Sequence, residues 1–367
     1  MPAGTFQVAN SVVTIDGQVL GEGGLGTDAF RNTIVYDAGR YHMWYVAEPD
    51  SWLSSVQRAT STDGVHFTTV PGSKLQPPAN WWAAAWYGQT ATAQPIANFI
   101  RVARLGSDWV MLVWHPNDTA TKPYSYNTSL WRLGPNLTAT ALSPIGPLRR
   151  SDTSPQGPGG RHVGVAGIVN NALYLIHQTP ASLGRYTFDP AAPDTDPAGE
   201  DIGRANLFAG TPWCGNEASC PAADRSYVFN RARVLDQGGT LRVYYTLRAS
   251  SGSRRDQQIY FAESTDDGLT WGDAQPVFPA ASAFTVNGQP PTTLGFSGPE
   301  VVDLGGGRYR GYFDAEDADG NLVLVTASQP DASSSIAPVP SLGTGSLLLL
   351  GLLAGGWGMR RLQTRQA

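Results

Sequence analysis

Two cysteines, Cys214 and Cys220, lie six residues apart in a loop rich in glycine, asparagine and serine. If they are paired, the disulfide staples a short surface loop and indicates an oxidising compartment. Otherwise they are two free thiols or a weak metal site. Zinc is disfavoured, because two thiol ligands without a histidine nearby do not complete a tetrahedral site.

An acidic run and an aromatic cluster are the other local groups that suggest binding. Residues 316–321 read Glu-Asp-Ala-Asp-Gly-Asn, but the spacing of a calcium-binding EF-hand is absent, so we expect a solvated hairpin turn. Residues 81–87, Trp-Trp-Ala-Ala-Ala-Trp-Tyr, offer flat faces for stacking on a sugar ring, and packing in a core explains them equally well. We find no P-loop, dinucleotide-binding or zinc-protease motif, and expect no cofactor or metal.

The composition indicates a turn-rich β protein. Of 367 residues, 41% are hydrophobic and only 15% are charged. The 42 glycines and 27 prolines supply turns, while 11 tryptophans and 14 tyrosines favour strands. A net charge of −5 with no basic stripe argues against nucleic-acid binding.

One hairpin pattern recurs five times along the chain. Each copy is a β-rich run, a turn of Asp, Asn or Gly residues and a second run rich in aromatic residues, which is typical of a β-hairpin. The copies lie at residues 33–45, 100–114, 166–176, 232–245 and 299–313. Equivalent positions in their second strands are 68, 63, 69 and 68 residues apart: Met43, Met111, Tyr174, Val243 and Gly311. A third strand follows each hairpin, at 56–60, 129–133, 185–188, 258–263 and 322–327.

This regular repetition of antiparallel sheets predicts an all-β, five-bladed β-propeller over residues 1–330. The fifth copy ends after its third strand. We therefore expect residues 6–20, with a turn at Asp16-Gly17, to supply the missing outer strand and close the ring. A β-sandwich is the alternative, but it does not explain periodic units of this length.

The C-terminal residues form a separate segment. A polar and proline-containing linker at 331–341 leads into the segment 342–367, whose apolar run Leu342–Met359 is 18 residues long. That length is just sufficient for a single hydrophobic helix to span a bilayer. Arg360 and Arg361 follow directly and predict a cytoplasmic end. A buried amphipathic helix is the alternative, although the run has no polar face.

This order of proline motif, apolar helix and arginines resembles the PEP-CTERM and IPTL-CTERM sorting tails. The motif Val339-Pro340-Ser341-Leu342 is closer to the IPTL type. The resemblance implies an exported protein of the cell envelope or exterior, held transiently in the membrane until an exosortase-like sorting protease reads the tail. The first ten residues lack the basic and apolar regions of a signal peptide, which conflicts with this expectation of export.

Residues 264–271, Ser-Thr-Asp-Asp-Gly-Leu-Thr-Trp, match the Asp-box of sialidase-like propellers at every fixed position. In that family the box joins the two outer strands, away from the sugar, so we interpret it as a mark of the fold. A variant occurs at 61–67, and Tyr41-His42-Met43-Trp44-Tyr45 precedes it. With these motifs the chain resembles the five-bladed glycoside hydrolases of the β-fructosidase, arabinanase and β-mannoside-phosphorylase type, over roughly residues 20–330 as architecture.

In such propellers the substrate lies in an axial funnel, lined by residues just before or within the innermost strand of each blade. The resemblance therefore implies a carbohydrate ligand and three candidate catalytic carboxyls, Asp28, Asp224 and Glu300. Hydrolysis of a glycosidic bond usually needs two carboxyls across the scissile bond, and the resemblance assigns Asp28 to the nucleophile or base. Glu300 or Asp224 would act as the general acid if burial raised its pKa. The same carry-over gives these candidate substrate-binding residues: Arg31, Trp82, Trp86, Gln89, Arg161, His162, Arg225, Asn230, Arg231 and Ser297.

The chain also departs from this family. The hydrolases place carboxylates in blades two and three, where this chain has Gln89 and the pair Arg161-His162. The arginines suit an anionic sugar held by bidentate pairing, or they are partners of the acids. Each carboxyl also has a structural alternative, in which it accepts bonds from strand-end amides or an arginine. Two functions therefore stay open: hydrolysis of a glycosidic bond, and non-catalytic carbohydrate binding or surface display.

Overall fold

The computed structural model describes the chain in segments that together contain 21 strands and no helix. These segments are residues 5–21, 32–46, 56–75, 99–114, 128–135, 137, 143–147, 162–170, 172–178, 181–187, 230–247, 258–278, 297–316 and 321–329. They all belong to Met1–Gln329, the first of two compact units into which the chain divides. The predicted linker and C-terminal helix lie outside the described residues. Within those segments no helix is long and apolar enough to cross a membrane.

The strands form five sheets, which we call blades 1 to 5 in chain order. Blade 1 is built from β4 (Asn32–Asp37), β5 (Arg40–Val46), β6 (Val56–Ser61) and β7 (His66–Thr69). Blade 2 is built from β8 (Phe99–Leu105), β9 (Asp108–Trp114), β10 (Thr128–Gly134) and β11 (Ser143–Pro147). The described strands of blade 3 are β12 (His162–Val169), β13 (Ala172–Gln178) and β14 (Ala181–Thr187).

Blade 4 contains β15 (Asn230–Asp236), β16 (Leu241–Leu247), β17 (Gln258–Ser264) and β18 (Gln275–Pro276). Blade 5 contains β19 (Ser297–Asp303), β20 (Tyr309–Glu316), β21 (Leu322–Ser328) and, as its outer strand, β1 (Gln7–Val12). The order β1-β21-β20-β19 confirms that the N-terminal segment completes the last blade. The strands of all five expected hairpins are also present.

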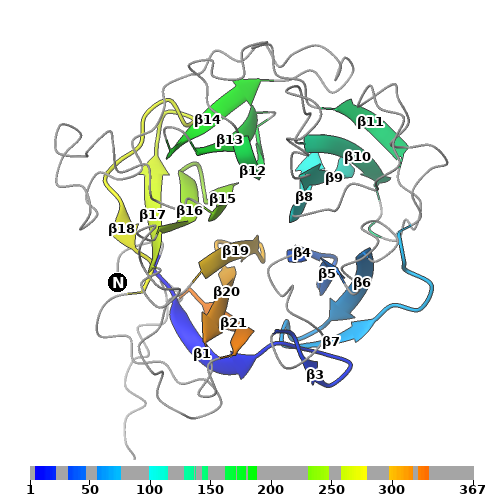
Figure 1. The fold of residues 1–367 in the computed structure, drawn as a ribbon. Helices are drawn as coiled ribbons and strands as arrows, with labels where there is room; N and C mark the ends of the chain where they lie inside the picture. Colours follow the sequence, from blue (N-terminus) through cyan, green and yellow to red (C-terminus); the bar gives the residue numbers. More distant parts are fainter. Residues whose placement is uncertain are drawn as a thin grey trace, which may run out of the picture. The chain divides into compact units, whose positions relative to one another are not determined.

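The innermost strand of each blade contacts the innermost strands of the two neighbouring blades. The contacts run β4 to β8, β8 to β12, β12 to β15, β15 to β19, and β19 back to β4. Figure 1 shows the five sheets around a common axis, with these strands nearest the centre. The sheets therefore form a closed ring, which confirms the five-bladed β-propeller and excludes the sandwich.

Each blade is buried on both faces, because apolar residues occupy successive positions along its strands. In β5, Met43 packs toward blade 5 and Trp44 packs toward blade 2, since neighbouring side chains of a strand point to opposite faces. Five hydrophobic clusters of described residues fill the five interfaces between neighbouring blades. The cores therefore lie between blades, and the ring depends on all of them.

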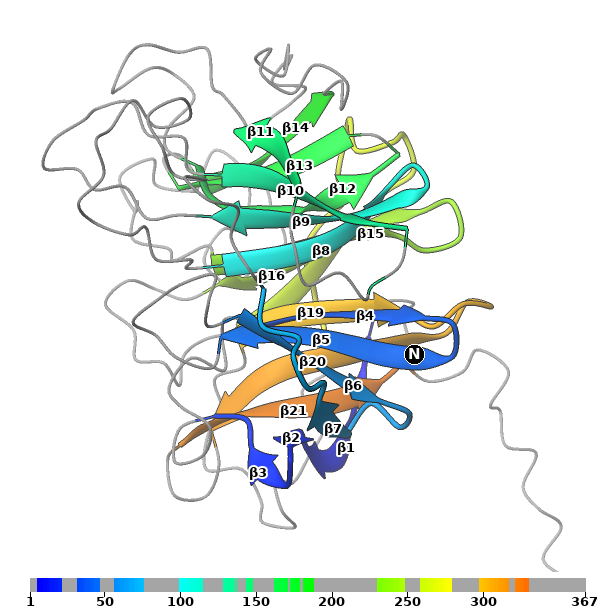
Figure 2. The ribbon, with the colours of Figure 1, turned by 90° about the vertical axis from the view of Figure 1, so that its right-hand side faces the viewer.

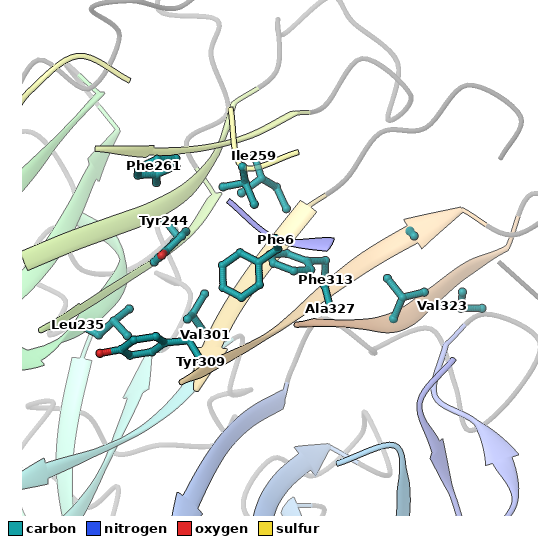
Figure 3. Packing of buried hydrophobic residues seen from close by; sticks show 13 residues of the cluster. Phe6, Leu235, Tyr244, Ile259, Phe261, Val301, Tyr309, Phe313, Val323 and Ala327 are labelled. Atoms are coloured by element: carbon teal, nitrogen blue, oxygen red, sulfur yellow. The ribbon is translucent and has the colours of Figure 1, made fainter. Parts of the chain in front are cut away.

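The N-terminal residues 5–21, which we call the strap, join three blades. Phe6 is fully buried, and its backbone N–H donates to Val277 O of blade 4 at 3.1 Å. Its ring contacts Tyr244 of blade 4 and Phe313 of blade 5 at centroid distances of 5.8 and 5.6 Å (Figure 3). After β1, strands β2 (Thr14–Ile15) and β3 (Gln18–Val19) extend blade 1 through a parallel pairing of β2 with β7. The strap thus closes the ring.

The turn at residues 264–271 is held by its own side chains. Asp266 accepts hydrogen bonds from Thr270 N at 2.9 Å, Thr270 Oγ1 at 2.5 Å and Ser264 Oγ at 2.7 Å. The bonds from Thr270 and then Ser264 lower the pKa of Asp266 to about 2. Asp266 therefore accepts both a backbone N–H and two hydroxyls within the turn.

The same turn docks on blade 3. Arg185 of β14 pairs with the Asp267 carboxylate at 2.6 Å, and Tyr174 Oη of β13 donates to Asp267 O at 3.4 Å. Burial raises the pKa of Tyr174 to about 12. The 264–271 turn therefore ties the outer part of blade 4 to its neighbour.

The turn at residues 61–67 repeats this docking between blades 1 and 5. Tyr312 Oη of β20 donates to Gly64 O at 2.9 Å, and Arg310 Nη1 donates to Asp63 O. Partial burial works to raise the pKa of Asp63, yet bonds from His66, Val65 and Ser61 together hold that pKa well below its usual range. Two turns with related sequences are thus each bound by a tyrosine and an arginine of the neighbouring blade, blade 3 for the first turn and blade 5 for the second.

Candidate functional site

Each blade presents the beginning of its innermost strand at the end of its hairpin opposite the tight turn. The cross-strand pairs nearest those strand starts are Asn32–Tyr45, Phe99–Trp114, His162–His177, Asn230–Thr246 and Ser297–Asp314. Figure 2 shows β4 and β19 lying side by side and pointing the same way. Gly298 N also donates to Thr246 Oγ1 at 3.1 Å, which joins the strand-start ends of blades 4 and 5. We call this end of the ring the strand-start end.

Most of the predicted site residues fall at or before these strand starts in the chain, whereas Glu300 lies within β19. His162 and Asn230 are the first residues of β12 and β15, Arg231 is the second residue of β15, and Ser297 is the first of β19. The structure describes the strand positions of these four residues but not their side chains. The remaining predicted residues lie outside the described residues: Asp28, Arg31, Trp82, Trp86, Gln89, Arg161, Asp224, Arg225, Cys214 and Cys220.

Glu300 is the predicted site residue whose side chain the structure describes. It lies in β19, and its carboxylate is buried against strands of two other blades. Oε1 accepts hydrogen bonds from Ile34 N and Thr33 Oγ1 of β4, each at 3.4 Å. Oε2 forms a salt bridge with Arg101 Nη1 of β8. All three contacts therefore use Glu300 as an acceptor.

Arg101, which the sequence analysis did not select, is the cation of this pair. Its side chain is 10% exposed and that of Glu300 is 5% exposed, so the salt bridge is buried. Arg101 Nη2 also donates to Ala232 O in β15 at 3.1 Å. Thr33 completes the network, because its Oγ1 accepts from Val102 N at 3.1 Å. The network joins the innermost strands of blades 1, 2, 4 and 5.

This geometry favours one role for Glu300 over another. A general acid must present an O–H to the leaving oxygen of the substrate. Glu300 instead directs both carboxylate oxygens at donors of the protein, and removing one partner from such a buried pair costs about 3 to 5 kcal/mol. The arrangement therefore supports the structural alternative, in which the carboxylate binds a neighbouring arginine and a strand amide. The catalytic role of Glu300 stays a prediction.

Asp314 is another buried acidic residue of blade 5, and unlike Glu300 it was not among the predicted site residues. It is fully buried near the C-terminal end of β20, where it pairs with Ser297, so it lies at the strand-start end of the ring. A buried carboxyl at this position is unusual for a strand, because burying such a group is costly unless it has partners. The described residues contain no group of three or more His, Cys, Asp or Glu side chains suited to a metal ion.

These features define a five-bladed β-propeller with a buried polar network at its axis. No protein-family model matches the chain, and no curated protein matches it. Similar solved structures include the native arabinanase of Bacillus subtilis, with a TM-score of 0.51 and 10% identity over 88% of this chain and 97% of that chain. A GH43 endo-arabinanase from Bacillus licheniformis has a TM-score of 0.52 and 12% identity over 87% of this chain and 96% of that chain.

A further structure, described as a glycoside hydrolase, has a TM-score of 0.53 and 10% identity over 88% of this chain and 91% of that chain. The structural neighbours of this propeller are therefore GH43 arabinanases and other glycoside hydrolases. At identities this low the likeness concerns the fold, and the function must be argued from the site.

Proposed function

We propose that this chain is a glycosidase-like propeller that binds a carbohydrate at the strand-start end of the ring and hydrolyses a glycosidic bond there. One observation carries the proposal. The ring brings five innermost strands together, and most of the predicted site residues precede or begin those strands in the chain. The likeness to arabinanases supports a pentose-containing or related polysaccharide as the ligand.

Within this proposal Asp28 and Asp224 are the catalytic carboxyls. Asp28 precedes β4 and Asp224 precedes β15, and these strands belong to different blades. Carboxyls from two sides of an axis can flank a scissile bond, one protonating the leaving oxygen and the other attacking or activating water. Arg31, Arg161 and His162 orient the substrate through its hydroxyl or carboxylate oxygens. Glu300 serves as the acceptor that holds Arg101.

Non-catalytic carbohydrate binding is the second candidate function. The engagement of Glu300 by Arg101 favours it, because this contact leaves fewer carboxyls free for acid–base chemistry. The polar and aromatic residues at 82–89 and 161–162 would still bind a sugar. Both functions use the same end of the ring, and turnover distinguishes them.

The test measures binding and hydrolysis on one panel of substrates. The purified protein is assayed against linear and branched arabinans, other plant polysaccharides, sialylated glycans and aryl glycosides. We expect the wild type to hydrolyse at least one of these substrates. The hydrolysis rate of Asp28→Asn should be lower by a factor of about 100 or more. Asp37→Asn is the matched control, because Asp37 belongs to the same blade but ends β4 beside the tight turn, where it pairs with Arg104 at 3.1 Å. The control should keep wild-type activity.

Three outcomes are informative. Hydrolysis lost in Asp28→Asn but not in Asp37→Asn supports the enzyme. Binding without turnover supports the carbohydrate-binding propeller. A wild-type protein that neither binds nor cleaves any member of the panel contradicts both functions.

We also propose that the protein is exported and sorted through its C-terminal segment. The observations behind this are the apolar run Leu342–Met359 and the arginines that follow it. A sorting protease would read the tail, and the Cys214–Cys220 disulfide would form outside the cytoplasm. Membrane fractionation of cells expressing the full chain, compared with a chain ending at Gln329, tests the anchor. Equal amounts of both chains in the soluble fraction would contradict it.

A further inference from the structure

The side chain of Arg101 crosses the axis of the ring. Arg101 belongs to β8, and its two described partners lie in β15 and β19. In the ring order, β12 lies between β8 and β15, and β4 lies between β8 and β19. Contacts that bypass a neighbouring strand on each side require the guanidinium to lie in the central space that the innermost strands enclose.

The network lies below the strand starts. Arg101 and Ala232 are the third residues of their strands, Thr33 is the second of its strand and Glu300 is the fourth of its strand. A strand rises about 3.3 Å per residue, so the network lies about 3 to 10 Å deeper than the first residues of these strands. Most predicted site residues precede that level. The guanidinium therefore lies further into the ring than the starts of these strands.

Arginine suits this position better than lysine does. Its planar guanidinium presents several donors at fixed angles, so that Nη1 can bind Glu300 while Nη2 binds Ala232 O. A lysine ammonium is a compact charge on a flexible stem and would not hold both partners in one geometry. The buried cation also needs an anion, which Glu300 supplies.

We infer that Arg101 is a positioning residue that closes the axis beneath the proposed site and fixes the starts of four innermost strands relative to one another. A ligand that enters from the strand-start end then cannot pass along the axis beyond Arg101. The effect on ligand binding rests on the proposed function, whereas the closure of the axis does not. The inference therefore has one test without ligand and one test with it.

The ligand-free test is amide hydrogen exchange of Arg101→Met. The amide of Ile34 donates to Glu300, and that of Val102 donates to Thr33, so both report on the network. We expect exchange at these two amides to accelerate about tenfold or more, because the loss of a charged hydrogen-bond partner releases the acceptors that protect them. Arg104→Met is the matched control in the same strand, since Arg104 is 46% exposed and binds Asp37 at the surface.

The ligand test uses debranched arabinan as the probe, with affinity measured well below the unfolding temperature. We expect Arg101→Met and the milder Arg101→Lys to weaken binding about tenfold, while Arg104→Met stays within twofold of wild type. Arg101→Lys keeps the charge beside Glu300, so it remains informative if Arg101→Met does not fold. A purely structural role would lower stability in both variants without changing the affinity of the folded protein.

The outcomes separate the inference from the proposed function. Unchanged exchange at Ile34 and Val102 in Arg101→Met overturns the inference. Faster exchange with unchanged arabinan affinity overturns the positioning role. Faster exchange with weaker binding, seen only at Arg101, supports both. If the wild type binds neither arabinan nor the wider panel, the proposed function fails, and the exchange rates alone then decide whether Arg101 fixes the innermost strands relative to one another.

Discussion

The two docking turns depend on glycines that leave room for a tyrosine of the preceding blade. Gly268 has a φ of +82°, and a Cβ built on it would lie 2.6 Å from Tyr174 Oη. Gly64 has a φ of +74°, and a Cβ there would lie 2.7 Å from Tyr312 Oη. Both positions therefore combine a left-handed backbone with a close approach by a buried ring.

Gly268→Ala should be more destabilising than a glycine substitution that changes backbone strain alone. Gly39 provides the comparison, because its φ is +80° and a Cβ there meets nothing within 4 Å. We expect Gly39→Ala to cost about 1 to 2 kcal/mol and Gly268→Ala to cost about 1 to 3 kcal/mol more, through the clash with Tyr174. Urea unfolding of both variants measures the difference. Equal losses would show that the tyrosine contact contributes nothing.

His42 should make the fold sensitive to mild acid. Burial first, and then the charge of Arg58, lower the pKa of His42 from 6.5 to about 4. The unfolded chain therefore binds a proton at this histidine more readily than the folded chain does. The resulting stability is fully present above pH 6.5 and is lost as the pH falls through 6.5 towards about 4.

We expect His42→Gln to flatten this pH dependence. The free energy of unfolding is measured by urea titration at several pH values above 6.5 and down to about 4. The wild type should lose stability across this window, and the variant should lose less. Parallel profiles for the two proteins would mean that other groups cause the acid sensitivity.

At the scale of elements, the strap contributes one side chain that joins blades 4 and 5. Phe6 is fully buried between Tyr244 and Phe313, so it bridges blades 4 and 5. We expect Phe6→Ala to cost about 3 to 5 kcal/mol, as for other large-to-small changes in a core. Leu269→Ala is the control, because Leu269 is 46% exposed and its truncation should change stability by less than about 0.5 kcal/mol. Similar unfolding midpoints for both variants would contradict a stabilising role for Phe6 between blades 4 and 5.

The sequence predicted the elements well because each hairpin carries its own signals. In β4 and β5 the apolar residues and the turn at Ala38-Gly39 are contiguous, and the same pattern recurs in the other blades. The outer strand β1 was also predicted, since the fifth copy lacked one. The parallel pairing of β2 with β7 was not predicted, because it joins residues about 50 positions apart through only two residue pairs.

The polar network was harder to predict for the same reason. Arg101 lies within an apolar run, Ile100-Arg101-Val102, and a charge there indicates a buried partner. Which partner it meets depends on the order of strands around the axis, and β8 and β19 are almost 200 residues apart. Glu300 was selected as a catalytic acid from its position alone, while its contacts with Thr33, Ile34 and Arg101 required coordinates.

At the scale of the whole molecule, the ring should unfold as one cooperative unit. Each blade buries both faces, so opening one interface exposes apolar surface on two blades. The interface between blades 2 and 3 is the most informative place to test this. Its described cluster is small and includes Leu130 of blade 2 with Ile168 and Leu173 of blade 3.

Leu130→Ala should therefore weaken the whole propeller and not only its own interface. Leu130 is fully buried, and its truncation should cost about 2 to 5 kcal/mol. Unfolding is followed by tryptophan fluorescence and by far-ultraviolet circular dichroism, and we expect both signals to shift together to a lower denaturant concentration. An early transition seen by one signal alone would mean that blades 2 and 3 separate while the others persist. That result would show that the strap and the axial network, which join blades 1, 2, 4 and 5, hold an open arc together without the contacts of blade 3.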